Sequence, residues 1–83
     1  MVISRQTVWV NFDEQLYLNK LGKRIASLRA ERGISQEKLA EAVGLHRTYI
    51  GFIEQGKRNP TIANLKKISI VLKVDLAVIF KNL

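Results

Sequence analysis

The 83-residue sequence has no cysteine, one proline, one histidine and no long apolar run. The lack of cysteine excludes a disulfide framework and a thiolate metal site. No apolar stretch approaches the ~20 residues that a transmembrane helix needs. The first twelve residues, MVISRQTVWVNF, lack the basic start, the long apolar middle and the cleavage site of a signal peptide. We therefore expect a soluble, cytoplasmic protein with no membrane partner.

Side chains that carry chemistry are also scarce. The single histidine, His46, has no cluster of metal ligands near it in the sequence, and no phosphate-cradling loop or pair of carboxylates is present. The sequence therefore does not indicate an enzyme, a cofactor or a small-molecule ligand.

Basic residues outnumber acidic ones by 14 to 7, which gives a net charge of +7. Residues 1–19 hold one basic and two acidic residues, a net of −1, so residues 20–83 hold the other 13 and 5, a net of +8. A small basic domain suits a polyanion such as nucleic acid. An ordinary soluble surface that happens to be basic would give the same balance.

The apolar pattern and the turn residues predict a chain that is mostly helical. The segment TVWVNF (7–12) alternates in polarity, which predicts a short strand or an extended arm. Helical spacing then runs from Leu18 to Leu28, so we expect a first helix that starts between Asp13 and Lys20 and ends at Gly33. We take residues 1–19 as an N-terminal extension and residues 20–83 as the domain.

Four further helices are predicted by their N-cap residues and their stripes of apolar residues. Ser35 caps the second, and Gly44 ends it; the third runs from about Arg47 to Gln55 and ends at Gly56. Thr61 caps the fourth, and Asp75 caps a last short one. The expected inner face of the fourth helix is Ile62, Leu65, Ile68 and Val71 or Leu72.

Residues 36–55 fit a helix-turn-helix unit, in which two short helices meet at a tight turn. Ala40 is small where the helices would cross, and Gly44 can take a positive φ in the turn. Ile50 and Ile53 are apolar where the second helix would pack back on the first.

The stretches SQEKLAEAVGL, RTYI, IE and GKRNPT resemble the Cro/C1-type (XRE-like) helix-turn-helix proteins. Among these, the small controller proteins of bacterial restriction–modification systems are the most similar. The resemblance covers roughly residues 20–80. It implies an all-α, five-helix, lambda-repressor-like domain that binds double-stranded DNA as a homodimer on a palindromic operator.

In this family the second helix of the motif enters the major groove, and its N-terminal residues meet base edges. The resemblance thus implies base contacts by Arg47, Thr48, Gly51 and Phe52. Arginine can bind guanine with two hydrogen bonds, although Arg47 can equally meet a phosphate or solvent. Glycine at position 51 would let DNA approach the backbone closely.

Phosphate contacts position such a domain on DNA. The residues implied for this role are Ser35, Gln36, Tyr49, Lys57, Arg58 and Asn59. Tyr49 can instead pack at the helix edge, and residues 57–59 can be an ordinary polar loop. The resemblance also implies an ion pair between Arg29 and Glu54.

The last helix and one side of the fourth imply a dimer interface, whose residues are Ile70, Leu76, Val78, Ile79 and Phe80. Alternatively, these side chains merely close the core of the monomer. The sequence departs from the family at His46, where a better helix cap is usual, and at Lys73, where glycine is usual.

Two functions follow from the sequence. The first is a transcriptional regulator of the controller type. The alternative is an antitoxin-type protein that binds a partner protein through an N-terminal strand and also regulates its own operon.

Overall fold

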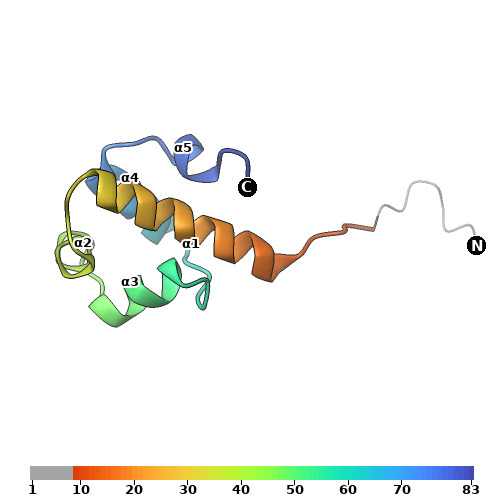
Figure 1. Cartoon of the computed structure of the whole chain (residues 1–83), viewed down its shortest axis with the longest axis horizontal. Coiled ribbons are helices and arrows are strands. Elements are labelled where there is room, and N and C mark those ends of the chain that lie inside the picture. Colours follow the sequence, from red (N-terminus) through yellow and green to blue (C-terminus); the bar gives the residue numbers. More distant parts are fainter. Residues whose placement is uncertain (1–8) are drawn as a thin grey trace, which may run out of the picture.

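The computed structural model describes residues 9–83, which form five helices and no strand. The helices are α1 (Glu14–Glu31), α2 (Gln36–Val43), α3 (Arg47–Glu54), α4 (Ile62–Leu72) and α5 (Leu76–Phe80). Figure 1 shows α1 running through the middle of the domain, with α5 on one side of it, α3 on the other and α2 near its C-terminal end. The predicted all-α, five-helix fold is confirmed.

Side-chain caps set the starts of the helices, because the first backbone N–H groups of a helix have no partner within it. Asp13 accepts a hydrogen bond from Leu16 N before α1, at 3.0 Å. Ser35 and Thr61 do the same for α2 and α4, also at 3.0 Å. These caps confirm the predictions. Asp75 occupies the cap position of α5 but makes no side-chain cap hydrogen bond.

The turn between α2 and α3 depends on Gly44, whose φ of +75° is in the left-handed region. Its conformation turns the chain so that Leu45 N donates to Ala40 O at 2.9 Å. Lys73 ends α4 with a φ of +58°, although it has a β-carbon. Lys73 therefore adopts a conformation that favours glycine, and it does so at a steric cost.

One hydrophobic core lies between the helices. Each helix contributes to it, and α1 contacts both α3 and α5 while α2 contacts α3 and α4. The hydrophobic residues with at most 2% exposure are Leu21, Ile25, Leu39, Ile50, Ile53, Leu65, Ile68, Leu72 and Ile79. The helix-turn-helix unit is therefore held on the same core as the rest of the domain.

The prediction for Ile62 in α4 was wrong, and the structure bears on two predictions about the N-terminal part. Residues 9–12 form no strand, while residues 7 and 8 lie outside the described part. The predicted boundary between residues 19 and 20 falls inside α1, because Asp13 caps a helix that continues to Glu31. Ile62 fits the stripe of α4 by spacing, yet it is 66% exposed because the first turn of α4 extends past the core.

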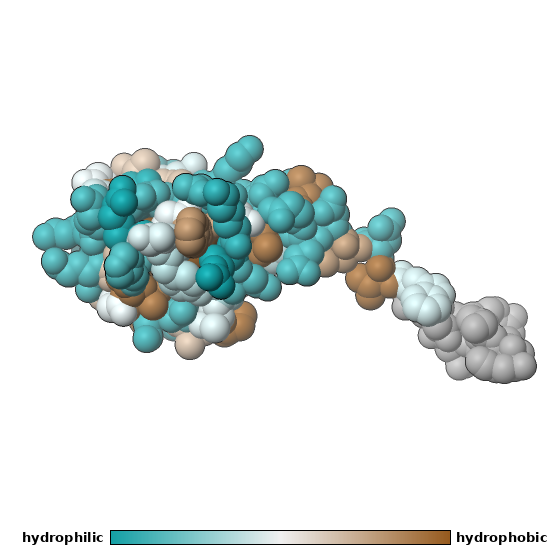
Figure 2. Space-filling view, turned by 90° about the horizontal axis from the view of Figure 1, so that it is seen from below, coloured by the Kyte–Doolittle hydropathy of each residue, from teal (hydrophilic) through white to brown (hydrophobic). Residues whose placement is uncertain are grey.

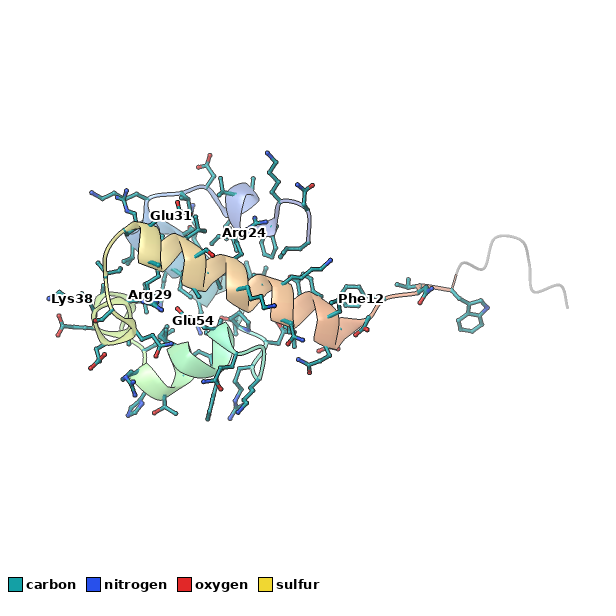
Figure 3. All side chains as sticks on the ribbon, viewed as in Figure 1. Phe12, Arg24, Arg29, Glu31, Lys38 and Glu54 are labelled. Atoms are coloured by element: carbon teal, nitrogen blue, oxygen red, sulfur yellow. The ribbon has the colours of Figure 1, made fainter. Side chains whose placement is uncertain are left out.

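Arg24 connects α1 to the end of the chain. Its guanidinium donates to the carbonyl oxygens of Val78 and Lys81, the latter at 2.8 Å. The last carbonyl groups of a helix have no partner within it, so this contact caps α5 from a neighbouring helix. Figure 3 shows Arg24 on the side of α1 that faces α5.

We predict that Lys73→Gly stabilises the protein. Glycine removes the clash of a β-carbon in the left-handed conformation, and part of this gain is offset by its greater freedom in the unfolded chain. The net gain should be about 0.5–1 kcal/mol, or roughly 3–6 °C in Tm for a domain of this size. Thermal unfolding followed by circular dichroism measures it.

Lys73→Ala is the matched control, because it removes the same charge and keeps the β-carbon. It should leave Tm nearly unchanged. An equal gain for the alanine variant would show that charge, not backbone strain, limits stability at this position.

Candidate nucleic-acid interface

α2 and α3 form the predicted helix-turn-helix unit. Ala40, Ile50 and Ile53 are buried where α2 and α3 pack on each other and α3 packs on α1. The turn leaves the N-terminal end of α3 exposed, with Arg47 and Thr48 at the surface. Figure 2 views the molecule from the α3 side, and this face is mostly hydrophilic with isolated hydrophobic groups. Its polarity suits contact with a polar polymer.

A buried ion pair holds α3 against α1. Arg29 donates from Nε to Glu54 Oε2 at 2.7 Å and from Nη2 to Glu54 Oε1 at 3.0 Å. The Glu54 side chain is only 5% exposed and the Arg29 side chain 18%. Figure 3 shows the two side chains pointing toward each other between α1 and α3. The structure thus confirms the ion pair implied by the sequence.

The pair extends into a hydrogen-bond network. Arg29 Nη1 donates to Ile34 O at 2.9 Å, and Gln36 Nε2 donates to Glu54 Oε1 at 2.8 Å. The hydrogen bond with Glu54 raises the pKa of Arg29, while burial lowers it by less. No buried side-chain polar atom in residues 9–83 lacks a partner. The network therefore fixes α1, α2 and α3 in one arrangement at little cost in unpaired groups.

Gly51 lies beneath this network rather than in the open. It is buried, and a β-carbon at this position would lie 3.7 Å from Gln36 Oε1. The side chain of Gln36 therefore covers the part of α3 where close approach of DNA was predicted. The small residue lets Gln36 lie across α3 and reach Glu54.

The other predicted base-reading residues are closer to the surface. Arg47 and Thr48 are exposed, and Phe52 is half-buried. Arg47 Nε lies 3.6 Å from Glu37 Oε1 on α2, in a pair with both side chains well exposed to water. Such a pair contributes little, so Arg47 can exchange this partner for another. Lys57 Nζ lies 5.9 Å from the centre of the Phe52 ring.

His46 caps α3, at the position where the sequence departs from the usual cap residues. Its Nδ1 accepts a hydrogen bond from Thr48 N at 3.1 Å. Nδ1 can accept only when the imidazole proton is on Nε2. The bond fixes the first turn of α3, where Arg47 and Thr48 are located.

Five of the six predicted phosphate contacts lie on two segments that flank α3 in the sequence, and the sixth, Tyr49, lies on α3 itself. Ser35 and Gln36 start α2, and Lys57, Arg58 and Asn59 follow α3 as an exposed loop that ends at the buried Pro60. Tyr49 is half-buried and packs against the core. It thus has the edge position that the sequence left open as its alternative role.

The predicted dimer residues divide into two groups. Ile70 is 62% exposed, Val78 is also exposed, and Leu76 and Phe80 are half-buried. Ile79 is 0% exposed. Because no atom of Ile79 reaches the surface, it belongs to the core of the monomer, and its assignment to a dimer interface was wrong.

Residues 25–79 match the helix-turn-helix family HTH_3. The chain belongs to this family.

Individual HTH_3 relatives agree with the resemblance seen in the sequence. Control protein C.MunI of Mycoplasma sp is 40% identical over 65 residues, which cover 77% of this chain and 88% of that protein. The crystal structure of the restriction–modification controller protein C.AhdI from Aeromonas hydrophila has 40% identity and a TM-score of 0.74, over 76% of this chain and 96% of the other. The biofilm regulator SinR, solved in complex with DNA, has 37% identity and a TM-score of 0.70, over 74% and 98%.

Sequence reasoning missed Gly22, which lies in the middle of α1 in this HTH_3 chain. A β-carbon there would lie 2.5 Å from Glu54 O and 2.8 Å from Glu54 C. The glycine therefore allows the C-terminal end of α3 to approach the backbone of α1. No turn or cap signal surrounds Gly22, so its sequence context gave no reason to single it out.

The part of the chain that the structure describes has neither a metal-binding cluster nor a membrane-spanning helix. Residues 9–83 contain no group of three or more His, Cys, Asp or Glu side chains placed to hold a metal ion. None of the described helices is both long and apolar enough to cross a membrane.

We predict opposite effects of alanine at the two helical glycines. Gly22→Ala should destabilise by about 1–3 kcal/mol, because its β-carbon would collide with the backbone of α3. Gly51→Ala should stabilise by about 0.5–1 kcal/mol, because the methyl group fits under Gln36 and alanine favours the helix. Urea unfolding of both variants measures the two values.

Each variant is the control for the other, since both add one methyl group inside a helix. A Gly22→Ala protein as stable as the wild type would mean that α1 and α3 are not in close contact. A loss of stability in Gly51→Ala would mean that Gln36 packs on α3 too tightly for a methyl group.

Proposed function

We propose that this chain is a sequence-specific transcriptional regulator that binds double-stranded DNA as a homodimer on a palindromic operator, and that it serves as a restriction–modification controller. The observation that carries the proposal is the exposed first turn of α3. It presents Arg47 and Thr48, while the Arg29–Glu54 pair fixes the far end of the same helix. A helix held in this way can enter the major groove with its N-terminal residues foremost.

Arg47, Thr48 and Phe52 are the proposed base readers. The Arg47 guanidinium can donate two hydrogen bonds to guanine O6 and N7, and Thr48 can hydrogen-bond a base or meet a thymine methyl group. The partly exposed ring of Phe52 can meet thymine methyls. In this proposal Gly51 contributes to DNA binding only indirectly, because the side chain of Gln36 covers it.

Phosphate contacts are proposed on both flanks of α3. The amide of Gln36 has two N–H donors, and the hydrogen bond to Glu54 leaves the second for a phosphate oxygen. Ser35 adds the N-terminal end of α2, where backbone N–H groups favour an anion. Residues 57–59 supply two positive charges and an amide on the other flank. These groups set the orientation of the domain and carry no sequence information by themselves.

The proposed dimer face consists of Ile70, Leu76, Val78 and Phe80. Ile70 and Val78 are exposed apolar side chains on α4 and α5, and water contact with such groups is removed by pairing with a second copy. A two-fold dimer of this kind would place its recognition helices about 34 Å apart, so that they meet successive major grooves.

The controller role is favoured over the antitoxin-type alternative. That alternative depended on a partner-binding strand near the N-terminus, and residues 9–12 form none. The controller role draws its support from the similarity to C.MunI and C.AhdI. It places the protein in the bacterial cytoplasm, with the DNA upstream of its own gene as the first candidate operator.

We predict that Arg47→Ala removes sequence discrimination and leaves weak, salt-sensitive binding. Loss of one bidentate base contact should cost about 1–3 kcal/mol on the operator, roughly 5- to 150-fold in Kd. Binding to unrelated duplexes depends mainly on the phosphate contacts and should change much less. Fluorescence anisotropy with the upstream DNA and with a shuffled duplex measures both.

Arg47→Lys is the control, because it keeps the positive charge and loses the two-pronged geometry. It should also lose discrimination. If both variants retain the wild-type preference for the upstream DNA, Arg47 is not a base reader. If the wild-type protein binds neither duplex at low salt, the proposed function itself is wrong.

We predict that Ile70→Asp converts a dimer to a monomer, since it places a charge in the proposed apolar interface. Ile62→Asp is a closely matched control, because Ile62 is similarly exposed on the same helix, 66% against 62%, but lies outside the proposed face. Size-exclusion chromatography with light scattering gives the masses. A dimeric Ile70→Asp protein, or a monomeric Ile62→Asp protein, would place the interface elsewhere.

A further inference from the structure

The first two turns of α1 lie against the turn that follows α3. Gln15 Nε2 donates to Gly56 O at 2.9 Å and to Asn19 Oδ1 at 2.8 Å. Both N–H groups of the Gln15 amide are therefore used, and Asn19 orients the amide toward Gly56. Gln15 and Asn19 lie before the residues that match the family, which begin at 25.

The peptide group between Gly56 and Lys57 is held at both of its ends. Its carbonyl oxygen accepts from Gln15, and its N–H, which belongs to Lys57, donates to Phe52 O at 2.8 Å. The plane of this peptide sets the direction in which the chain leaves α3. Its orientation therefore depends on one bond within the recognition helix and its turn, and on one bond from α1.

The backbones fit closely at the same point. Gly56 has a φ of +75°, and a β-carbon on it would lie 3.1 Å from Asn19 Cα and 3.2 Å from Asn19 N. Glycine is thus required both by conformation and by the approach of α1. A contact of this kind leaves the start of the loop little freedom to shift along α1.

The loop that follows has few supports of its own. Lys57, Arg58 and Asn59 are exposed and belong to no helix, and the next buried residue is Pro60. The loop is therefore fixed at Gly56 on one side and at Pro60 on the other. The Gly56 end is held by a side-chain hydrogen bond from Gln15, which lies outside the helix-turn-helix unit.

We infer that Gln15 is a positioning residue for DNA binding, which acts by fixing the loop 57–59 in the direction needed to reach phosphates. The inference rests on the proposed function in one respect, that this loop contacts DNA. It extends the binding machinery to a turn of α1 that precedes the family match and that touches no DNA itself.

The test compares Gln15→Met with Leu16→Met. Methionine at 15 keeps the length of the side chain and removes the donor, while methionine at the neighbouring exposed position leaves the Gly56 contact intact. The probe is a mixed-sequence DNA duplex, because phosphate contacts need no particular operator. Binding is measured over a series of salt concentrations, at a temperature where circular dichroism shows each variant to be fully folded.

We expect Gln15→Met to bind up to about tenfold more weakly at low salt, the equivalent of one missing hydrogen bond in the folded loop. The slope of log K against log[salt] should fall by about 1 for each phosphate that the loop no longer reaches. Leu16→Met should match the wild type in both. A purely structural role of Gln15 would lower Tm and leave the salt slope of the folded protein unchanged.

Hydrogen exchange of the free protein gives a second measurement that does not depend on DNA. The Lys57 amide should exchange up to about tenfold faster in Gln15→Met, while the Ile68 amide in the core of α4 should not change. Unchanged exchange at Lys57 overturns the inference, and so does faster exchange with an unchanged salt slope. A wild-type protein that binds no duplex would refute the proposed function and leave the anchoring of the loop to be judged by exchange alone.

Discussion

The arrangement of this domain depends on the buried ion pair between Arg29 and Glu54. Taking a carboxylate from water to a site with 5% exposure is costly unless its charge and its lone pairs find partners. Here the carboxylate accepts two hydrogen bonds from Arg29 and one from Gln36. The net stability from such a pair is small, but removal of either partner leaves an uncompensated charge. Its main effect is therefore to specify one position of α3 relative to α1 and α2.

A stripe of residues on α1 also helps to fix the position of α3. Two residues of this stripe meet the turn after α3: Gln15 bonds the Gly56 carbonyl, and Asn19 lies against the Gly56 backbone. Two others meet the C-terminal end of α3: Gly22 lies against the Glu54 backbone, and Arg29 bonds the Glu54 side chain. These contacts leave the N-terminal turn of α3 uncovered. The domain thus holds α3 by several contacts at its C-terminal end and leaves open the end proposed to read DNA, which is the arrangement that precise docking in a groove requires.

Much of this fold could be predicted from local signals. The Ser35 and Thr61 caps, the Gly44 turn and the apolar stripe of α3 each depend on residues close in sequence, and each was confirmed. The N-terminal segment was less predictable, because alternating polarity forms a strand only where a second strand is available to pair with it, and residues 9–12 form none. Ile62 fits its stripe as well as Ile68 does, and only the extent of the core distinguishes them.

In the candidate site, too, local features could be predicted and long-range contacts could not. The positions of Arg47 and Thr48 follow from the motif, while the contacts of Gln15 and Gly22 join residues more than 30 positions apart and leave no periodic trace. Whether a contact could be predicted therefore depended more on how close its residues are in the sequence than on their importance for function.

Gly51 shows how a prediction from local sequence and a long-range contact bear on the same residue. Its sequence context indicated a position open to DNA, and the structure places Gln36 over it instead. A β-carbon added at position 51 would lie 3.7 Å from Gln36 Oε1, so a methyl group fits there. A longer side chain would have to displace the Gln36 side chain. Displacement would break the bond from Gln36 to Glu54 and leave Glu54 Oε1 with the hydrogen bond from Arg29 alone. The size limit at position 51 therefore comes from the network behind α3, and through Gln36 the same network reaches the surface proposed to bind phosphate.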